Sequence, residues 1–377
     1  MNITFVDLIK NQFCANWEDA RTLRCSDHRR NSVHTSLGHV YDYLKNANID
    51  TKITDEGKRN LCIIFEMFAR WTEILQLENI LPTYKELTKT LEHILSEWVG
   101  EESKDFIVSI TEGEYSTINP FYDLTTLNDI TDVGWHAHFD YIILEIRAPR
   151  YFFEDMFSNS VLFHELGHFI DFKQHFSDTV FSDIKDILED PALNSTLISQ
   201  SFPYLAATGY KPSRDEKKVR SHIQEYFADI FGTQYVGEHI LNHVLRRADN
   251  LLDAEDSEHP CANSRLAMVT EFLKYCSIGT TTNILLNGIL NVAHNANGDK
   301  LKCHYGNVNS SQLIRGHKIS ITNDTQLYGV YKTIWNLYDK GLKIFTPINP
   351  KPAWSKSTFE WYKLLNFLAK DSINTYL

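Results

Sequence analysis

The stretch Val161-Leu162-Phe163-His164-Glu165-Leu166-Gly167-His168-Phe169-Ile170 places a His-Glu-x-x-His pattern inside an apolar run. On a helix, positions i and i+4 lie on one face, about 6 Å apart along the axis. His164 and His168 can therefore bind one metal ion, while Glu165, about 100° around the helix, can reach a water on that metal. A helix that is apolar nearly all round is buried, and buried histidines beside a buried glutamate are costly unless a metal satisfies them. The stretch predicts a buried metal-binding helix.

A catalytic zinc site needs a third protein ligand, because tetrahedral zinc keeps its fourth position for water. Asp171, further along the same helix, lies in a row with the two histidines and cannot surround an ion with them. The metzincin pattern HExxHxxGxxH also fails, since Asp171 stands at its glycine and Gln174 at its third histidine. The third ligand is therefore expected from another segment.

The downstream segment Gln224-Glu225-Tyr226-Phe227-Ala228-Asp229 offers carboxylates on a second predicted helix. Glu225 and Asp229 are four residues apart and share one face, and the small Ala228 permits close packing against another helix. One carboxylate can bind the metal while the other accepts the N–H of a ligating histidine and fixes its tautomer. We favour Glu225 as the ligand, with His222 and Asp229 as alternatives.

These motifs together resemble the gluzincin metallopeptidases, of which thermolysin is the familiar representative. HELGH followed by a distant Glu225-x-x-x-Asp229 carries the resemblance, and the Ala228-Asp229 pair is most similar to the HtpX and CAAX-prenyl-peptidase branch. That branch has an HPxxxxR segment, which is matched here by His259-Pro260-Cys261-Ala262-Asn263-Ser264-Arg265. The resemblance covers about residues 158–266. Its relatives are often membrane-embedded, whereas this chain shows no spanning segment, so their substrate does not carry over.

The resemblance implies a zinc ion bound by three side chains: His164, His168 and Glu225. It also implies that Glu165 is the general base and that Asp229 supports a ligating histidine from behind. His259 and Arg265 would be further catalytic residues near the site, in supporting or oxyanion-stabilising roles. Pro260 would occupy the first turn of a helix, where its missing N–H costs nothing.

The surrounding patterns predict an α+β, mostly helical fold with a zincin-like core, in which a small β-sheet packs on the HExxH helix. Strands are expected over 106–110, 115–118 and 141–146, with Gly113 turning the first two into a possible hairpin. Helices are expected over 35–99, with one break at Pro82, over 213–236 and over 325–340. For the second of these, a Ser213–Glu216 capping box marks the start and Gly237 the end. We divide the chain into a helical N-terminal region (1–103), a metallopeptidase core (104–280) and a helical, aromatic C-terminal region (281–377).

The whole-chain composition narrows the class of protein. A net charge of −12 argues against non-specific binding to nucleic acid. The N-terminus lacks the pattern of a signal peptide, and no apolar run is long enough to span a membrane. The cysteines occur without CxxC pairs, as expected of reduced thiols in a cytoplasmic protein: Cys14, Cys25, Cys62, Cys261, Cys276 and Cys303.

The sequence thus predicts a cytoplasmic zinc metallopeptidase that acts on a peptide or protein substrate, with Glu165 as general base. One alternative is a zinc amidohydrolase that acts on a small amide. Another is a metal-stabilised protein-binding or sensing module without turnover. Glu165 disfavours the last, because a purely structural zinc site needs no general base and is usually closed by four protein ligands.

Overall fold

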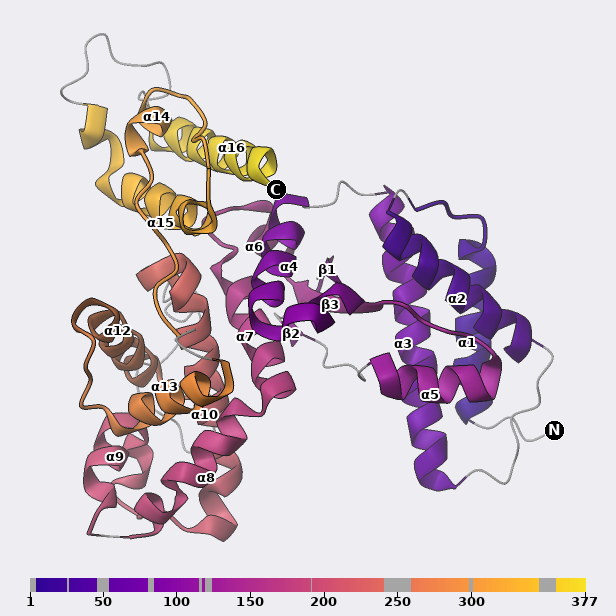
Figure 1. Cartoon of the computed structure of the whole chain (residues 1–377), viewed down its shortest axis with the longest axis horizontal. Coiled ribbons are helices and arrows are strands. Elements are labelled where there is room, and N and C mark those ends of the chain that lie inside the picture. The colour runs from indigo at the N-terminus through magenta and orange to yellow at the C-terminus, as the bar shows by residue number, and fades with distance from the viewer. Residues whose placement is uncertain are drawn as a thin grey trace. The chain divides into compact units, whose positions relative to one another are not determined.

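The computed structural model describes residues 5–25, 27–45, 54–80, 85–114, 117–118, 124–190, 192–240, 259–297, 301–345 and 357–377. These described residues are mostly helical with one small sheet, which confirms the α+β, mostly helical class (Figure 1). They form two compact units. Unit 1 comprises the described residues within Met1–Thr88, Glu92–Thr111 and Asn119–Glu145, and unit 2 those within Lys89–Leu91, Glu112–Ile118 and Ile146–Leu377. The three-region division at 103/104 and 280/281 stays a prediction.

The first part of the chain carries these elements: α1 (Phe5–Ala20), α2 (His28–Leu44), α3 (Asp55–Ile80), α4 (Lys85–Val99), a 3₁₀ helix (Gly100–Asp105), β1 (Phe106–Glu112), β2 (Thr117–Ile118), α5 (Leu124–Trp135) and β3 (Ile142–Ala148). Helices predicted over 35–99 are confirmed, although the chain also leaves the helix after Leu44, where no break was predicted. Pro82 lies outside the described residues.

The second part carries the remaining helices: α6 (Arg150–Glu154), α7 (Ser160–Gln174), α8 (Phe176–Glu189), α9 (Asn194–Ser201), α10 (Pro212–Val236), α12 (Ala262–Ile278), α13 (Ile284–Asn297), α14 (Ser310–Ile314), α15 (Asp324–Lys340) and α16 (Thr358–Tyr376). Short 3₁₀ helices occur at Pro203–Leu205, Gly237–Ile240 and Gly341–Phe345. The helix predicted over 325–340 is confirmed as α15. None of the described helices is both long and apolar enough to cross a bilayer.

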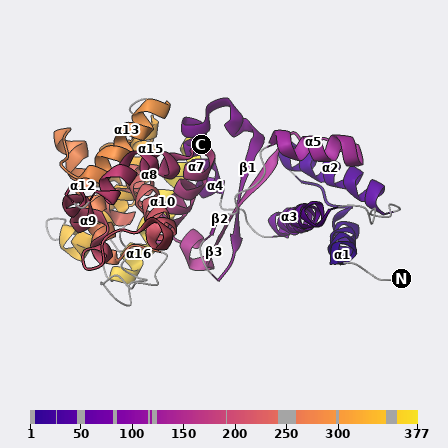
Figure 2. The same ribbon diagram turned by 90° about the horizontal axis from the view of Figure 1, so that it is seen from below.

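Unit 1 is built on the packing of α1 against α3, with α2 and α5 beside them (Figure 2). The buried residues of α1 recur at helical spacing, from Val6 to Trp17, so one apolar face meets its neighbours. The core of this unit is aromatic: Phe13 lies 5.8 Å from Phe68 and Phe68 lies 5.3 Å from Phe139, measured between ring centroids. This packing forms a hydrophobic centre that contains none of the predicted metal ligands.

The sheet corrects one prediction. Its strand order is β1-β3-β2, and β2 runs antiparallel to β3, with Thr117 opposite Arg147 and Ile118 opposite Ile146. The hairpin between the first two strands is therefore wrong, because β3 lies between them. Strand β3 is central and pairs on both edges, which agrees with the burial of all but one of its residues. The edge strand β2 lies against α7, the helix that carries HELGH.

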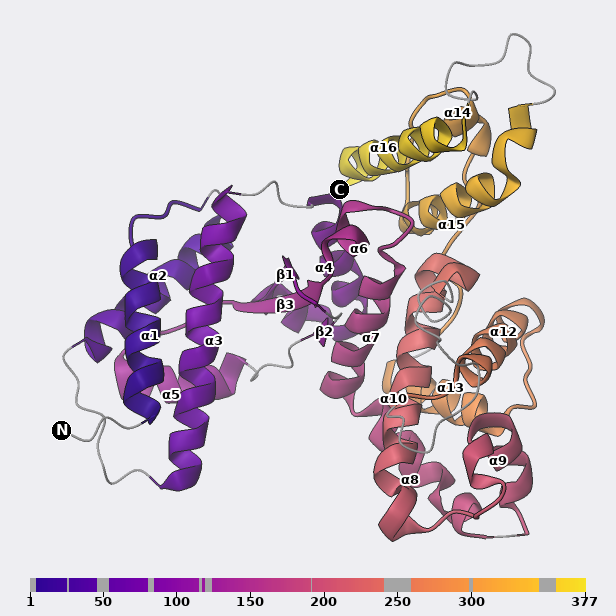
Figure 3. The ribbon, with the colours of Figure 1, turned by 180° about the vertical axis from the view of Figure 1, so that it is seen from behind.

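In unit 2, α10 contacts α7, α8, α12 and α15 (Figure 3). Its C-terminal half is buried without a break from Glu225 to Val236, because neighbouring helices cover it from several sides. The predicted stop at Gly237 is confirmed, with a φ of 67° that favours glycine.

The predicted capping box of α10 is wrong. The helix begins one residue earlier than expected, with Pro212 in its first turn and no side-chain cap at Lys211. The carboxylate of Asp215 accepts the backbone N–H of Lys211 instead, at 2.8 Å. The start of α10 is thus stabilised by a side chain from within its first turn.

Candidate metal centre

Helices α7 and α10 pack closely against each other at Gly167. A Cβ atom on Gly167 would lie 2.9 Å from the Cα of Ala228 and 3.2 Å from its carbonyl oxygen, so only glycine fits there. The small Ala228 predicted to permit close packing is thus the residue against which α7 rests. Gly232, one turn further along α10, also faces α7, since its added Cβ would lie 3.4 Å from the backbone nitrogen of His164. These contacts bring Glu225 within reach of the histidines of α7.

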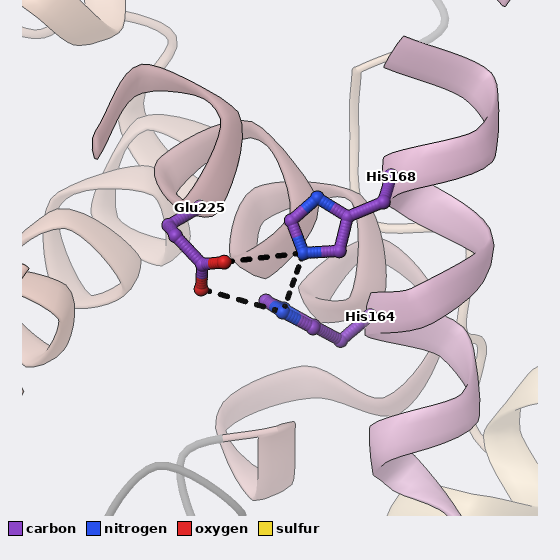
Figure 4. A group of neighbouring side chains, drawn as sticks. All are labelled: His164, His168 and Glu225. Carbon is purple, nitrogen blue, oxygen red and sulfur yellow. Dashed lines mark hydrogen bonds and ion pairs between the residues drawn. The ribbon is translucent and has the colours of Figure 1, made fainter. Parts of the chain in front are cut away.

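Donor atoms from three side chains converge in this interface (Figure 4). The Nε2 atoms of His164 and His168 are 3.1 Å apart. Oε2 of Glu225 lies 3.5 Å from Nε2 of His164, and Oε1 lies 3.3 Å from Nε2 of His168. Two atoms that share one tetrahedral zinc at bonds of 2.0–2.1 Å lie about 3.3 Å apart. The three side chains therefore form a group that can hold a metal ion, and their spacing and donor types suit zinc.

Asp229 lies behind His164. Its Oδ1 is 3.0 Å from Nδ1 of His164, the ring nitrogen that faces away from the donor group. This is the arrangement in which a carboxylate fixes the tautomer and orientation of a metal-binding imidazole. Asp229 is fully buried, so its own charge requires a partner.

Arg265, at the start of α12, supplies that partner. Its Nε and Nη2 atoms donate to the two carboxylate oxygens of Asp229, both at 2.6 Å. A third guanidinium nitrogen, Nη1, lies 3.3 Å from Oε2 of Glu225. Arg265 is 8% exposed and is committed to these carboxylates, which favours its supporting role over an oxyanion role.

His259 lies on the accessible side of the group. Its Nδ1 is 2.9 Å from Oε1 of Glu225, and 64% of its side chain is exposed. Pro260 and Cys261 separate it from α12, which begins at Ala262 with Cys261 as N-cap. The expectation that Pro260 occupies the first helical turn is therefore wrong, because the thiol of Cys261 caps the helix by accepting the N–H of Ser264.

The charges of the group favour a bound cation. Burial opposes a charge on His164, but its contacts with Asp229 and Glu225 outweigh burial and raise the pKa of His164 to about 9. Burial also opposes ionisation of the carboxylates, yet the nearby Arg265 charge lowers the pKa of Asp229 to about 2 and that of Glu225 well below its usual value. Both carboxylates therefore stay ionised and favour the protonated, positively charged ring of His164. A metal ion coordinated by this ring would supply positive charge at the same place.

The other residues considered from the sequence are not members of the donor group formed by His164, His168 and Glu225. Glu165, 6% exposed, follows His164 on α7 and points about 100° around the helix from it. The alternative ligand His222 is outside the donor group, and its buried ring packs against Tyr204 with centroids 5.0 Å apart. Asp171 accepts the backbone N–H of Ser177 at 2.7 Å and so stabilises the start of α8.

Sequence reasoning did not identify Gly167 as part of the site. One indication was present in the sequence, a glycine inside an otherwise apolar helix. Glycine destabilises a helix interior, so its presence at this position points to close packing against a neighbour. The partner of Arg265 was also missed. Pairing an arginine with a particular carboxylate depends on how α10 and α12 cross, which no spacing along the chain encodes.

Replacing Gly167 by alanine should separate α7 from α10. We expect a loss of about 1–3 kcal/mol in the free energy of unfolding from overpacking, and zinc affinity weakened on the order of tenfold because Glu225 moves away. Thermal melts and competition with a chelator measure the two effects. Gly288→Ala in α13 is the control, since its Cβ would meet Val180 at an ordinary 3.6 Å. Equal melting temperatures and equal zinc affinities for the two variants would show that the contact at Gly167 does not hold Glu225 in place.

Zinc binding at about pH 7.5 should release one proton from the His164 ring, in addition to the proton that a zinc-bound water loses at about pH 7. The pKa of His164 is raised to about 9, so the metal-free ring is protonated at this pH, whereas a metal ligand must be neutral. Zinc affinity should accordingly fall as the pH is lowered from 9 towards 7.5. Calorimetric titration in buffers of different ionisation enthalpy counts the proton. Glu165→Gln, which keeps the ligand set, should release the same number, and binding without proton release would refute the assignment.

No model of a known protein family, no curated protein and no solved structure matches this chain. The geometry and charges of the site are therefore the observations that bear on function.

Proposed function

We propose that this protein is a zinc-dependent metallopeptidase of gluzincin type that hydrolyses peptide bonds in a peptide or protein substrate. The observation that carries the proposal is the convergence of two imidazole nitrogens and one carboxylate within 3.1–3.5 Å of one another, with a glutamate next to the first histidine. Two histidines and one glutamate are the ligand set of hydrolytic zinc enzymes that leave one coordination position open. The β2 edge strand against α7 fits a zincin-like core.

His164, His168 and Glu225 would hold the zinc ion, with Asp229 orienting the ring of His164. Bound zinc supplies a Lewis acid that polarises a carbonyl and lowers the pKa of a coordinated water to about 7. The donor groups come from two helices that pack closely at Gly167, so their geometry is held rigid before any ligand arrives.

Glu165 is the general base. Its carboxylate takes the proton of the attacking water and then delivers it to the leaving amine. Glu165 is 6% exposed, so its carboxylate is largely shielded from bulk water.

His259 is suited to stabilise negative charge on the substrate oxygen. It is well exposed beside Glu225, and their hydrogen bond is the main cause of its raised pKa, which favours the protonated, donating ring. One such donor typically contributes about 3 kcal/mol to the transition state. Arg265, by contrast, acts through the two carboxylates that it holds.

Metal analysis of the purified protein tests the ligand set. The wild type should contain about one zinc per chain and Glu225→Ala should lose most of it, because zinc with two histidine ligands alone is weakly held. Glu189→Gln, at the exposed end of α8, should keep the wild-type content. A wild type that stays metal-free after zinc is supplied would refute the proposal, and unchanged zinc in Glu225→Ala would exclude Glu225 as a ligand.

Turnover tests the role of Glu165. Glu165→Gln should retain zinc but lower the cleavage rate of an unfolded protein substrate by about 10²–10⁴-fold, the usual contribution of a general base. Cleavage is followed by the new amino termini released. A Glu165→Gln protein that keeps both zinc and wild-type activity would exclude the mechanism, while loss of zinc in this variant would make Glu165 a ligand instead.

A further inference from the structure

The 3₁₀ helix η3 (Gly237–Ile240) directly follows α10 and contacts α7, α12 and α15 as well as α10. The side chain of Ile240 is fully buried and lies over Gly232, where an added Cβ atom would come within 2.6 Å of it. The same Cβ position is 3.4 Å from the backbone nitrogen of His164. Ile240 therefore packs where α10 meets the helix that carries the metal-binding histidines.

The neighbouring residue His239 holds η3 against α15. Its imidazole lies nearly parallel to the indole of Trp335, with ring centroids 5.0 Å apart and an angle of 6° between the planes. His239 is 4% exposed. Phe157 packs edge-on against Trp335 with centroids 5.3 Å apart, so the indole is itself held in place. The histidine ring is thus enclosed between η3 and a fixed aromatic neighbour.

The Nε2 atom of His239 is buried and has no hydrogen-bond partner among the described residues. A neutral imidazole tolerates this, because one of its nitrogens carries no proton and acts only as an acceptor. A protonated ring would place a charged N–H donor where no acceptor lies, which costs far more than an unused lone pair. The face of Trp335 attracts a cation but offers Nε2 no acceptor. The position of the ring therefore favours neutral His239.

The charges around His239 also oppose its protonation. Of the described residues that α7, α10, α12 and α15 bring around the ring, Lys332 on α15 is the one whose charge acts on it. Burial is the main cause that lowers the pKa of His239 to about 4, and the Lys332 ammonium lowers it further. A hydrogen bond with Asn336 acts in the opposite direction and has the smallest effect. Glu238, next in the chain, is exposed.

We propose that η3 is a pH-sensitive switch in unit 2: protonation of the His239 ring expels it from Trp335 and withdraws Ile240 from the contact between α10 and α7. The buried Nε2 without a partner, the stacked indole and the packing of Ile240 over Gly232 carry this assignment. Zinc held by the donor group would then be lost more readily in acid, a consequence that rests on the proposed zinc site.

The direction of the effect follows from the two states of the ring. A released His239 takes up a proton below about pH 6.5, whereas the packed ring does so only below about pH 4. The packed state of η3 is therefore fully stable above about pH 6.5. Below that value its population relative to the released state falls by up to about tenfold for each pH unit, until about pH 4.

Hydrogen exchange measures the release of η3. The full-length protein, supplied with zinc, is exchanged at about pH 7.5 and at about pH 5, and masses are measured for peptides that cover residues 230–240. Rates are corrected for the intrinsic pH dependence of amide exchange. We expect the amides of residues 237–240 in the wild type to open on the order of tenfold more often at the lower pH. A wild type that binds no zinc would refute the proposed function but leave this measurement valid.

Matched variants assign the effect to His239. His239→Phe keeps an aromatic ring on Trp335 but cannot be protonated, so its corrected exchange should be equal at both pH values. His317→Phe, the same change at an exposed histidine of unit 2, should respond as the wild type. Lys332→Met leaves His239 in place and raises its pKa towards the ordinary value, so the acid response should shrink. Acid should also speed zinc transfer to a chelator more in the wild type than in His239→Phe.

Three results would overturn the proposal. One is a wild type in which acid opens residues 237–240 no more than the rest of unit 2. A second is an equal acid response in the wild type and His239→Phe, or in the wild type and Lys332→Met if the phenylalanine variant does not fold. The third is zinc transfer that acid speeds equally in the wild type and His239→Phe, which would contradict the link to the metal site.

Discussion

The close contact between α7 and α10 is the constraint on which the candidate site depends. At Gly167 the backbones approach so closely that a single methyl group would collide with Ala228. This contact places a carboxylate of α10 beside two imidazoles of α7, which no single helix can arrange, because side chains at i and i+4 form a row rather than a ring. The small residues at the crossing are thus as much part of the candidate metal site as its donor atoms.

Charge balance is the second requirement of the site. Glu225 and Asp229 are both buried, and two such carboxylates are tolerated only when positive charge lies beside them. Arg265 provides one positive charge from α12, and the converging nitrogens and oxygen attract another. In the absence of metal a proton on His164 fills this need, since its pKa is raised to about 9. The polar network therefore links three helices and favours a cation at their junction.

Much of the site was predictable because helical periodicity relates neighbours in sequence to neighbours in space. The spacing of His164 and His168, and that of Glu225 and Asp229, each describe one turn of a helix. Predictions failed where a partner came from elsewhere in the chain. The expected hairpin ignored β3, which pairs between β1 and β2, and the expected capping box at Ser213 ignored the carboxylate of Asp215.

The sequence by itself determined which residues can carry the chemistry: imidazoles and carboxylates at one-turn spacing on two apolar helices, and a mostly helical class of fold. Only the tertiary structure decided that Glu225 rather than His222 joins the histidines, and that Arg265 binds Asp229. It also decided that α7 and α10 pack closely at Gly167. The physical reason is that periodicity along a helix assigns side chains to a face, whereas the partner of that face depends on how two helices cross, which the packing of the whole unit establishes.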